Sequence, residues 1–401
     1  MIWDIMKRLG YYMFNIFYYI FYLFPINKNK MLLIMTHDVS SEGNILYSFN
    51  YFKSKNPVLF FKKITKELYD FKIDGKLMKK IINFFIFTPY HVATSKMIFL
   101  DNIFLPFAYT KFKKDVAVVQ LWHGTGSIKK FALDSETGLI KELAIRSNSK
   151  NTHLLVGSEN MVPVYQTAFK MDRKKIFPIG LPRTDIFFNK RYIRNKEKEF
   201  YEKYPELFEK KIVLYAPTFR DESFKSQLRK NKKLDLDDNL NLNLKIFDLF
   251  KYLDEDYVLI LKLHPAVSKH FSLEKLSLNP FFKDKIRDFS DFNSLNSIMI
   301  VSDCIITDYS SIIFEYSLLG KKMIFYPYDL EDFESYSRGF YFDYKEFVPG
   351  DICLSIEEIS KKIKDKINNE DQIILFKNKY MEKCDGKSTE RLQLILNNFG
   401  E

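Results

Sequence analysis

The sequence predicts an α/β protein with two doubly wound parallel sheets, and two observations lead to this fold class. Short apolar runs alternate with longer segments of helical character, in two blocks separated by the charged stretch Lys190–Lys211. The chain of 401 residues is longer than one ordinary α/β domain. Because 46% of the residues are hydrophobic, the sequence can form two cores, and long disordered tracts are not expected. We therefore expect two Rossmann-like domains that face each other.

The predicted strands are compact runs rich in β-branched or aromatic residues that end in polar or glycine residues. In the first block they are Met31–His37, Met97–Asn102, Val116–Trp122, His153–Gly157 and Ile176–Gly180. In the second block they are Ile212–Pro217, Tyr257–His264, Asp303–Thr307 and Met323–Pro327. Amphipathic helices are predicted at Leu242–Leu253 and Ile312–Leu319. The expected domains are residues 28–195 and 205–385, with a hinge near 188–210 and a C-terminal helix at 386–401.

The N-terminal segment Ile2–Phe24 is almost wholly apolar and aromatic and stops at Pro25. Its longest uninterrupted run is shorter than the roughly 20 residues that span a bilayer, and it carries no small-residue cleavage site. Basic residues flank it, as is typical of helices at the headgroup boundary. We expect residues 1–27 to form an amphipathic helix on the membrane surface. The alternatives are a terminal helix buried against the first domain and a short membrane span.

The net charge of +11 has two explanations: the protein binds anionic partners, or its lysine-rich composition reflects codon bias. The basic residues are scattered and form no recognised nucleic-acid module, so we expect no nucleic-acid partner. The three cysteines, Cys304, Cys353 and Cys384, form no CxxC pair, which favours a reducing cytoplasm and argues against a zinc site or a disulfide framework. An Asp235-Leu-Asp237 triplet lies inside the polar patch Lys230–Asn243 and is interpreted as an acidic loop. We expect neither a metal nor a cofactor.

The first candidate cluster is Gln120–Ser127, which ends a predicted strand and opens into a glycine-containing loop. His123 is presented at the strand tip, where an imidazole can take or give a proton near neutral pH. Gly124 lets backbone amides approach a ligand closely, and Thr125 and Lys129 follow in the same loop. A packed or capping histidine is the alternative.

The second cluster ends the predicted strand Tyr257–His264, where Pro265 turns the chain out of the strand directly after His264. In parallel sheets, ligands bind outside the carboxyl ends of the strands. His123 and His264 come from such ends in opposite domains, so both are placed to line one cleft.

The third cluster, Thr307–Ser311, runs directly into a predicted helix. This cluster supplies the hydroxyls of Thr307, Ser310 and Ser311, with Asp308 between them. The unpaired backbone amides at the start of the helix favour an anion, so the cluster suits a pyrophosphate. An ordinary serine N-cap is the alternative. Glu315 follows one turn later on the same helix face, where its carboxylate can accept hydrogen bonds from the hydroxyls of a ribose. The alternative is an ordinary solvated charge on the helix surface.

Two further strand-end groups supply hydroxyl and cationic donors. Thr218 and Arg220 follow the strand Ile212–Pro217, and Arg338 lies in a later glycine-containing loop. Arginine suits bidentate contact with phosphate. A structural ion pair with a neighbouring aspartate is the alternative for each arginine.

Several motifs together resemble the CDP-glycerol glycerophosphotransferase family. They are Gln120–Lys129, Gly180–Asp185, Tyr215–Arg220, Leu263–Pro265, Thr307–Ser311, Ser337–Tyr341 and Asp385–Arg391. The resemblance implies a GT-B fold with CDP held mainly by the second domain, and monotopic attachment to the cytoplasmic face of the membrane. It implies that His123 and His264 are the two histidines needed for activity. It also places Thr307, Ser310 and Ser311 in a pyrophosphate loop and Arg338 in an RGxY element.

The expected function is transfer of an alditol phosphate, glycerol phosphate in the first place, from a CDP-alditol to a hydroxyl of a lipid-linked glycan or growing teichoic-acid-like or capsular polymer. The expected partners are therefore CDP-glycerol or CDP-ribitol, a lipid-linked acceptor and the membrane surface. The main alternative is a GT-B hexosyltransferase that uses a nucleotide sugar, and a non-catalytic polymer-binding protein is a third possibility. The choice of alditol, the number of units added and the oligomeric state stay open.

Overall fold

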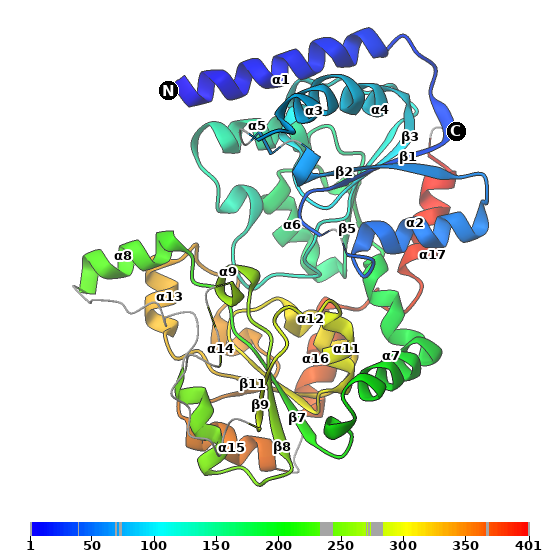
Figure 1. Ribbon diagram of the computed structural model, residues 1–401. Helices are drawn as coiled ribbons and strands as arrows, with labels where there is room; N and C mark the ends of the chain where they lie inside the picture. The colour runs from blue at the N-terminus through cyan, green and yellow to red at the C-terminus, as the bar shows by residue number, and fades with distance from the viewer. Residues whose placement is uncertain are drawn as a thin grey trace. The chain divides into compact units, whose positions relative to one another are not determined.

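The chain folds into two compact units, each built on its own parallel sheet (Figure 1). The computed structural model describes residues 2–38, 40–68, 70–71, 74–232, 244–269, 271, 273, 284–365 and 369–399. The first unit comprises Met1–Gly126, Phe131–Phe188 and Glu382–Glu401, and the second comprises Ser127–Lys130 and Asn189–Met381. The α/β class with two parallel sheets is thereby confirmed. The triplet Asp235–Asp237 lies outside the described residues.

The sheet of the first unit has six strands in the order β2-β1-β3-β4-β5-β6, all parallel. The strands are β1 (Asn27–Met35), β2 (Phe60–Thr65), β3 (Ser95–Leu100), β4 (Ala117–Gln120), β5 (His153–Val156) and β6 (Ile176–Pro178). The helices of this unit are α1 (Ile2–Phe21), α2 (Asn44–Lys55), α3 (Leu77–Ile82), α4 (Thr88–Thr94), α5 (Gly138–Asn148), α6 (Val162–Phe169) and α17 (Ser388–Asn397).

The second sheet also has six parallel strands, in the order β12-β11-β10-β7-β8-β9. The strands are β7 (Lys211–Ala216), β8 (Tyr257–Leu261), β9 (Ile286–Asp288), β10 (Cys304–Thr307), β11 (Lys322–Phe325) and β12 (Asp351–Ile352). The helices are α7 (Lys190–Lys203), α8 (Glu222–Lys232), α9 (Pro265–Ser268), α11 (Leu295–Val301), α12 (Ile312–Leu318), α13 (Leu330–Tyr336), α14 (Tyr344–Phe347), α15 (Ile356–Lys364) and α16 (Glu370–Tyr380).

Three strands were not predicted from the sequence, β2, β9 and β12, and each is the edge strand of its sheet. β2 reads Phe-Phe-Lys-Lys-Ile-Thr and is mostly exposed, so it lacks the apolar run by which buried strands are recognised. β9 and β12 have three and two residues, too few for any pattern. The central strands were all identified, because both of their faces are buried and they are apolar throughout.

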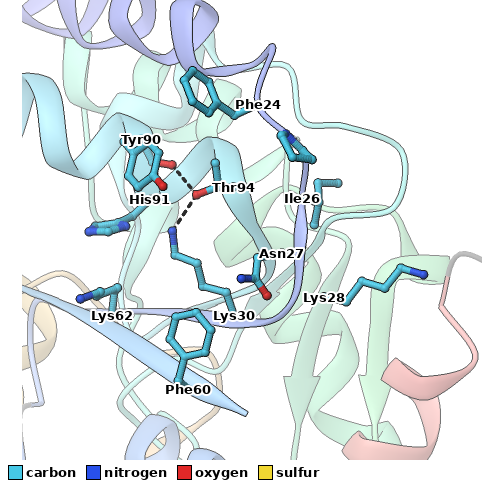
Figure 2. Close-up of a pocket in the computed structure, with 11 residues that line it drawn as sticks. Phe24, Ile26, Asn27, Lys28, Lys30, Phe60, Lys62, Tyr90, His91 and Thr94 are labelled. Atoms are coloured by element: carbon cyan, nitrogen blue, oxygen red, sulfur yellow. Dashed lines mark hydrogen bonds between the residues drawn. The ribbon is translucent and has the colours of Figure 1, made fainter. Parts of the chain in front are cut away.

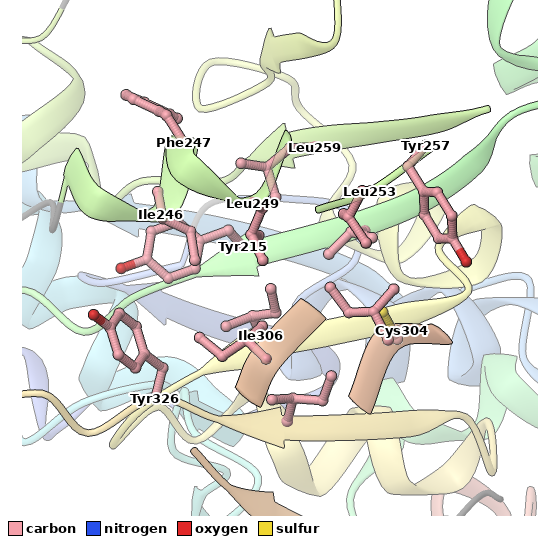
Figure 3. Close-up of a cluster of buried hydrophobic side chains, with 14 of the residues drawn as sticks. Tyr215, Ile246, Phe247, Leu249, Leu253, Tyr257, Leu259, Cys304, Ile306 and Tyr326 are labelled. Atoms are coloured by element: carbon pink, nitrogen blue, oxygen red, sulfur yellow. The ribbon is translucent and has the colours of Figure 1, made fainter. Parts of the chain in front are cut away.

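The predicted helix Leu242–Leu253 is a 3-10 helix over Leu244–Lys251 in the structure. Its buried side chains repeat every third residue, Ile246 with Leu249 and Phe247 with Phe250, which is the spacing of the tighter helix. Figure 3 shows this helix against Tyr215, Leu259 and Ile306 from three neighbouring strands, which form one side of the second core.

The C-terminal helix α17 completes the first unit, although more than 190 residues separate it from the other parts of that unit. The Asp185 carboxylate accepts hydrogen bonds from the backbone amides of Ser388 (3.0 Å) and Thr389 (2.9 Å), which start the helix. Gly180 has a φ of +87°, and a Cβ there would lie 2.2 Å from the carbonyl oxygen of Lys383. The motifs Gly180–Asp185 and Asp385–Arg391 therefore join the two ends of this unit.

The helix α1 lies along the first unit with one face packed and the other exposed (Figure 1). Phe14 and Tyr18 are buried in the core, and the Asn15 amide donates to the carbonyl of Pro106 at 2.9 Å. The opposite face carries exposed apolar side chains at helical spacing: Ile5, Leu9, Tyr12, Ile16 and Ile20. Among the described residues, no helix is long and apolar enough to cross a membrane.

Candidate active site

The tip of β4 is shaped by an unusual backbone conformation at Trp122. Its φ is +55°, a left-handed value that is uncommon for a residue other than glycine. The Asn44 side-chain amide donates to the carbonyls of Leu121 (3.3 Å) and Trp122 (3.1 Å), and the indole packs against Phe169. Such conformations persist where the surroundings hold them, often at functional sites, and this one sets the position of His123.

The imidazole of His123 is fixed in one tautomer by a backbone carbonyl. Its Nδ1 lies 2.9 Å from the carbonyl oxygen of Asp101, and because a carbonyl can only accept, Nδ1 carries the proton. Nε2 is then the ring atom able to take a proton. Burial, reinforced by the nearby His37, lowers the pKa of His123 to about 3, so the ring is neutral at physiological pH.

The loop after β1 supplies a neighbour of His123 that the sequence analysis missed. The rings of His37 and His123 lie 3.6 Å apart between centroids. The Asp101 carboxylate holds this loop by accepting hydrogen bonds from the backbone amides of Thr36, His37 and Asp38, at 2.8–3.1 Å. The signal was present, because Thr36–Asp38 is a polar group at a strand end, but the predicted strand extended to His37 and concealed it.

Arg183 links the loop after β1 to the loop after β4. Its guanidinium donates to the carbonyl of His123 at 3.0 Å and lies 3.8 Å from the carboxylate of Asp38. Gly124 is partly exposed and its carbonyl accepts from the Tyr165 hydroxyl, whereas Thr125 is buried. Of the residues expected in this unit, the structure therefore leaves His123 and Gly124 accessible.

The second unit contains a fully buried arginine between two carboxylates. Arg220 donates to Asp308 Oδ2 at 2.5 Å and to the two oxygens of Asp329 at 2.7 and 3.0 Å. It also donates to the carbonyl of Thr218, and the Thr218 amide donates to Asp308 Oδ1 at 2.8 Å. The coulombic attraction of Arg220 holds the pKa of Asp308 below its usual value despite burial. The structural alternative for Arg220 is thus observed, with Asp329 as one partner.

One guanidinium between two carboxylates leaves this cluster with a formal charge of −1, and Lys129 is the cation beside it. The ammonium of Lys129 lies 5.9 Å from the centroid of the Phe333 ring, and its backbone pairs with Phe340. Burial lowers the pKa of Lys129 to about 7, against the raising effect of Asp308. Arg338 is half exposed and contacts Asp221 at 3.5 Å. Of the three predicted site cations that lie in this unit, Lys129 and Arg338 therefore remain suited to a ligand, and Arg220 does not.

The remaining predicted residues follow β8 and β10. The imidazole of His264 is exposed and stacks on Phe219, with ring centroids 4.9 Å apart and an interplanar angle of 14°. Thr307 is buried and donates to the carbonyl of Ala216, so it serves the sheet. Ser310 and Ser311 are half-buried before α12, and Glu315 is 8% exposed.

The structure therefore gathers the predicted residues of the second unit at one end of its sheet. Lys129, Thr218, Arg220, Asp308 and Arg338 adjoin one another. Among the described residues, no group of three His, Cys, Asp or Glu side chains is arranged to hold a metal ion.

Polar loops at the carboxyl ends of two parallel sheets define a class of α/β proteins that bind nucleotide-like ligands at those ends. Within that class the chain belongs to the family described as CDP-Glycerol:Poly(glycerophosphate) glycerophosphotransferase, which matches residues 16–397. The expected family resemblance is thereby confirmed.

Curated relatives agree with this assignment. The chain is 33% identical over 391 residues to a teichoic acid poly(ribitol-phosphate) polymerase of Bacillus spizizenii, covering 96% of this chain and 59% of the relative. It is 37% identical over 318 residues to a teichoic acid ribitol-phosphate primase of the same organism, covering 77% of each. It is 32% identical over 316 residues to a teichoic acid glycerol-phosphate primase of Bacillus subtilis, covering 77% of this chain and 75% of the relative. The chain thus spans less than two thirds of the first of these relatives.

Solved structures support the fold. The wall teichoic acid polymerase TagF matches with a TM-score of 0.75 and 21% identity, covering 99% of this chain and 95% of that chain. A UDP-GlcNAc 2-epimerase from Neisseria meningitidis matches with a TM-score of 0.52 and 14% identity, covering 92% and 100%. At these identities the likeness concerns the fold.

Proposed function

We propose that this chain transfers an alditol phosphate from a CDP-alditol to a hydroxyl group of a membrane-linked acceptor or growing teichoic-acid-like polymer, and releases CMP. Membership of the glycerophosphotransferase family supports this reaction. The observation that carries it is His123, a neutral imidazole at a strand tip whose tautomer leaves Nε2 as the proton acceptor. A GT-B arrangement, in which the units face each other, belongs to the same proposal.

In the reaction, the acceptor oxygen attacks the β-phosphorus of the CDP-alditol. The bond between that phosphorus and the bridging oxygen breaks, and the bridging oxygen leaves with CMP. His123 Nε2 takes the proton of the acceptor hydroxyl, while the carbonyl of Asp101 stabilises the protonated ring through Nδ1. Phosphoryl transfer depends chiefly on positioning and electrostatics, so no covalent intermediate is required.

The donor is held by the second unit in this proposal. Lys129, Arg338 and His264 neutralise the pyrophosphate, and the loop of Ser310 and Ser311 contributes hydroxyls. Arg220 differs from the expectation, because both of its edges are occupied by Asp308 and Asp329. We assign it a positioning role: it fixes the loops that carry Thr218 and Asp308.

Product analysis tests the reaction. The protein is incubated with CDP-glycerol or CDP-ribitol and a lipid-linked acceptor, and the released nucleotide and the acceptor are analysed. We expect CMP together with a longer acceptor. Release of a nucleoside diphosphate from a nucleotide sugar would instead favour the hexosyltransferase alternative. Glycerol phosphate remains the expected unit, and CDP-ribitol is the necessary comparison because relatives named for both alditols match.

His123→Ala tests the proposed base. Loss of a general base costs about 10²–10⁴ in rate, so turnover should fall by that factor while CDP-glycerol binding is kept. His123→Asn, which retains a polar side chain of similar size, is the matched variant and should be equally slow. Turnover close to that of the unchanged protein in either variant, with donor binding intact, rules out this role.

The proposal also places the protein at the cytoplasmic face of the membrane, attached through α1. The exposed apolar face of this helix supports that location, because such a stripe on a terminal helix suits the headgroup boundary. Leu9→Glu and Ile16→Glu together should abolish sedimentation with lipid vesicles, while Lys174→Glu, a change at an exposed residue in the turn before β6, should not. Sedimentation that survives the double change would contradict attachment through α1.

A further inference from the structure

A cavity of about 740 Å³ opens in the first unit where α1 ends and β1 begins (Figure 2). Phe24 lines it from the segment after α1, Lys30 from β1, Lys62 from β2, and Tyr90, His91 and Thr94 from α4. We call it the α1–β1 cavity. None of its described lining residues is acidic, and its three lysines come from two strands, Lys28 and Lys30 from β1 and Lys62 from β2. No part of the proposed reaction uses it.

Lys30 is the central cation of this cavity. Its side chain is only 4% exposed, and Figure 2 shows it extended from β1 toward α4. The ammonium donates to the Thr94 hydroxyl at 2.6 Å and lies 4.8 Å from the centroid of the Tyr90 ring. A buried charge is costly unless an opposite charge accompanies it, and burial lowers the pKa of Lys30 to about 8. At neutral pH the ammonium is nevertheless charged.

Two further groups converge on the same place. In the β1–β2 register Lys30 pairs with Phe60 and Leu32 with Lys62, so Lys30 and Lys62 lie on the same face of the sheet. The Nδ1 atom of His91 is buried without a hydrogen-bond partner among the described residues. Both lysines repel a proton on His91, whose pKa burial lowers to about 4. An anion between these groups would relieve the repulsion and accept a hydrogen bond from His91.

We propose that the α1–β1 cavity binds the phosphate group of an anionic phospholipid. Exposed apolar side chains directly after α1 lie at the cavity: Leu23 is 87% exposed, and Phe24, which lines the cavity, is 49% exposed. Acyl chains lie against these apolar side chains while the headgroup phosphate reaches Lys30 and Lys62. The inference rests on the proposed attachment of α1 to the membrane, and it adds that the protein prefers anionic lipid headgroups to neutral ones.

The test compares two lysines that carry the same charge and line the same cavity. Lys28 is exposed and points away from Lys30 in Figure 2, whereas Lys30 is buried. Diffuse attraction to an anionic surface acts on exposed charges, so it predicts the larger loss for Lys28→Met. A built site predicts the larger loss for Lys30→Met. Affinity is measured by sedimentation with vesicles of phosphatidylcholine alone and of phosphatidylcholine mixed with phosphatidylglycerol.

We expect the unchanged protein to bind the phosphatidylglycerol vesicles more tightly than the neutral ones. One surface lysine contributes about fivefold to the affinity for an anionic membrane. Lys30→Met and Lys62→Gln should each reduce the preference for phosphatidylglycerol vesicles by more than this factor. Lys28→Met should lose no more than that. Lys30→Met removes a buried charge that has no carboxylate partner among the described residues, so its Tm should be equal or higher, and this result would show that the variant is folded.

Three outcomes overturn the proposal, and they separate its failure from that of the proposed function. If Lys30→Met and Lys62→Gln keep the preference, the cavity is not the headgroup site, although membrane attachment stands. If free glycerol phosphate raises the Tm of the unchanged protein but not of Lys30→Met, while vesicle binding is unaffected, the ligand is a soluble phosphate instead. If the unchanged protein binds neither kind of vesicle, membrane attachment fails as well.

Discussion

The two units have similar sheets but differ in the charge state of the residues at the carboxyl ends of their strands. In the first unit, His123 is neutral and its ring is oriented by a backbone carbonyl. In the second unit, the carboxyl ends of the strands carry Arg220, Asp308 and Asp329 as a buried ionic cluster. In the proposed reaction the first unit accepts a proton and the second unit binds the charged pyrophosphate, and phosphoryl transfer to an alcohol requires both tasks.

The largest effect should come from the ionic cluster. Arg220→Gln leaves two buried carboxylates without their cation, a change that costs about 3–5 kcal/mol. Both tryptophans, Trp3 and Trp122, belong to the first unit, so hydrogen exchange rather than tryptophan fluorescence should report the loss in the second unit. The half-exposed Arg338 is the matched control.

Arg338→Gln should cost no more than about 1 kcal/mol of stability, because exposed ion pairs contribute little. It should instead weaken CDP-glycerol binding, measured by calorimetry. If Arg338→Gln destabilised the second unit as much as Arg220→Gln, the distinction between a structural arginine and a ligand-binding arginine would be wrong.

Acid should act on the first unit more than on the second. Burial lowers the pKa of His153 to about 4, so the unfolded chain takes up a proton near pH 6.5 while the folded unit does not. Stability is therefore lost as the pH falls below about 6.5, by about 2 kcal/mol from this group at pH 5. Urea unfolding followed by tryptophan fluorescence at pH 7 and pH 5 measures this.

His153→Gln should remove only the share of that pH dependence that His153 contributes, about 2 kcal/mol. Burial also lowers the pKa of His91 to about 4 and that of His123 to about 3, so these two groups act in the same direction. His153 stacks on Phe177 away from the β4 tip, so the change is not expected to alter the pH dependence of catalysis directly. An unfolding midpoint in the unchanged protein that is equal at both pH values would show that the buried histidines do not control the acid stability of this unit.

The pH dependence of donor use should come from the second unit. The pKa of Lys129 is lowered to about 7, so its positive charge is present below that pH and is lost above it. Because the charged form is proposed to bind the pyrophosphate, kcat/KM for the donor should fall as the pH rises through about 7. His123, with a pKa near 3, should add no acid limb between pH 5 and 8.

Lys129→Arg should move the falling limb to higher pH, since an arginine stays protonated. The neighbouring exposed Lys130→Arg should leave the profile unchanged. A profile that is insensitive to Lys129→Arg would remove Lys129 from the donor site.

The smallest effect should come from His37. If its ring serves to hold the ring of His123 in place, His37→Phe keeps the contact and should retain most of the turnover. His37→Ala removes it and should cost about tenfold through misplacement of the base. Equal activity in both variants would show that the ring contact is unnecessary, and equal loss would assign the imidazole a chemical role.

The central strands and the positions of the strand-end loops could be predicted from the sequence, because both depend on the local pattern of apolar residues. It could not assign Arg220, because a buried arginine and a ligand-binding arginine look alike until Asp308 and Asp329 are seen to occupy both of its edges. The contact between His37 and His123 joins residues 86 positions apart and depends on the order of strands β1, β3 and β4.

The segment 127–130 gives a second case in which local pattern was insufficient. It follows the β4 loop directly, yet Lys129 pairs with Phe340 and the Lys130 amide donates to Gly339 in the second unit. The sequence analysis grouped Lys129 with His123, whereas its backbone pairing with Phe340 places it in the second unit, where the charge of Asp308 acts on it. The family motif Gln120–Lys129 therefore serves both units.

The attachment of α17 to Asp185 has a consequence for biosynthesis. The second unit is made between two portions of the first, and Leu392 and Leu396 fill the first core only when the last helix is present. On the ribosome, the second unit is complete in sequence before the first can close. The His123 loop thus sits on a scaffold finished by residues 388–397, so a nascent chain can assemble its charged cluster well before it has a finished framework for the proposed base.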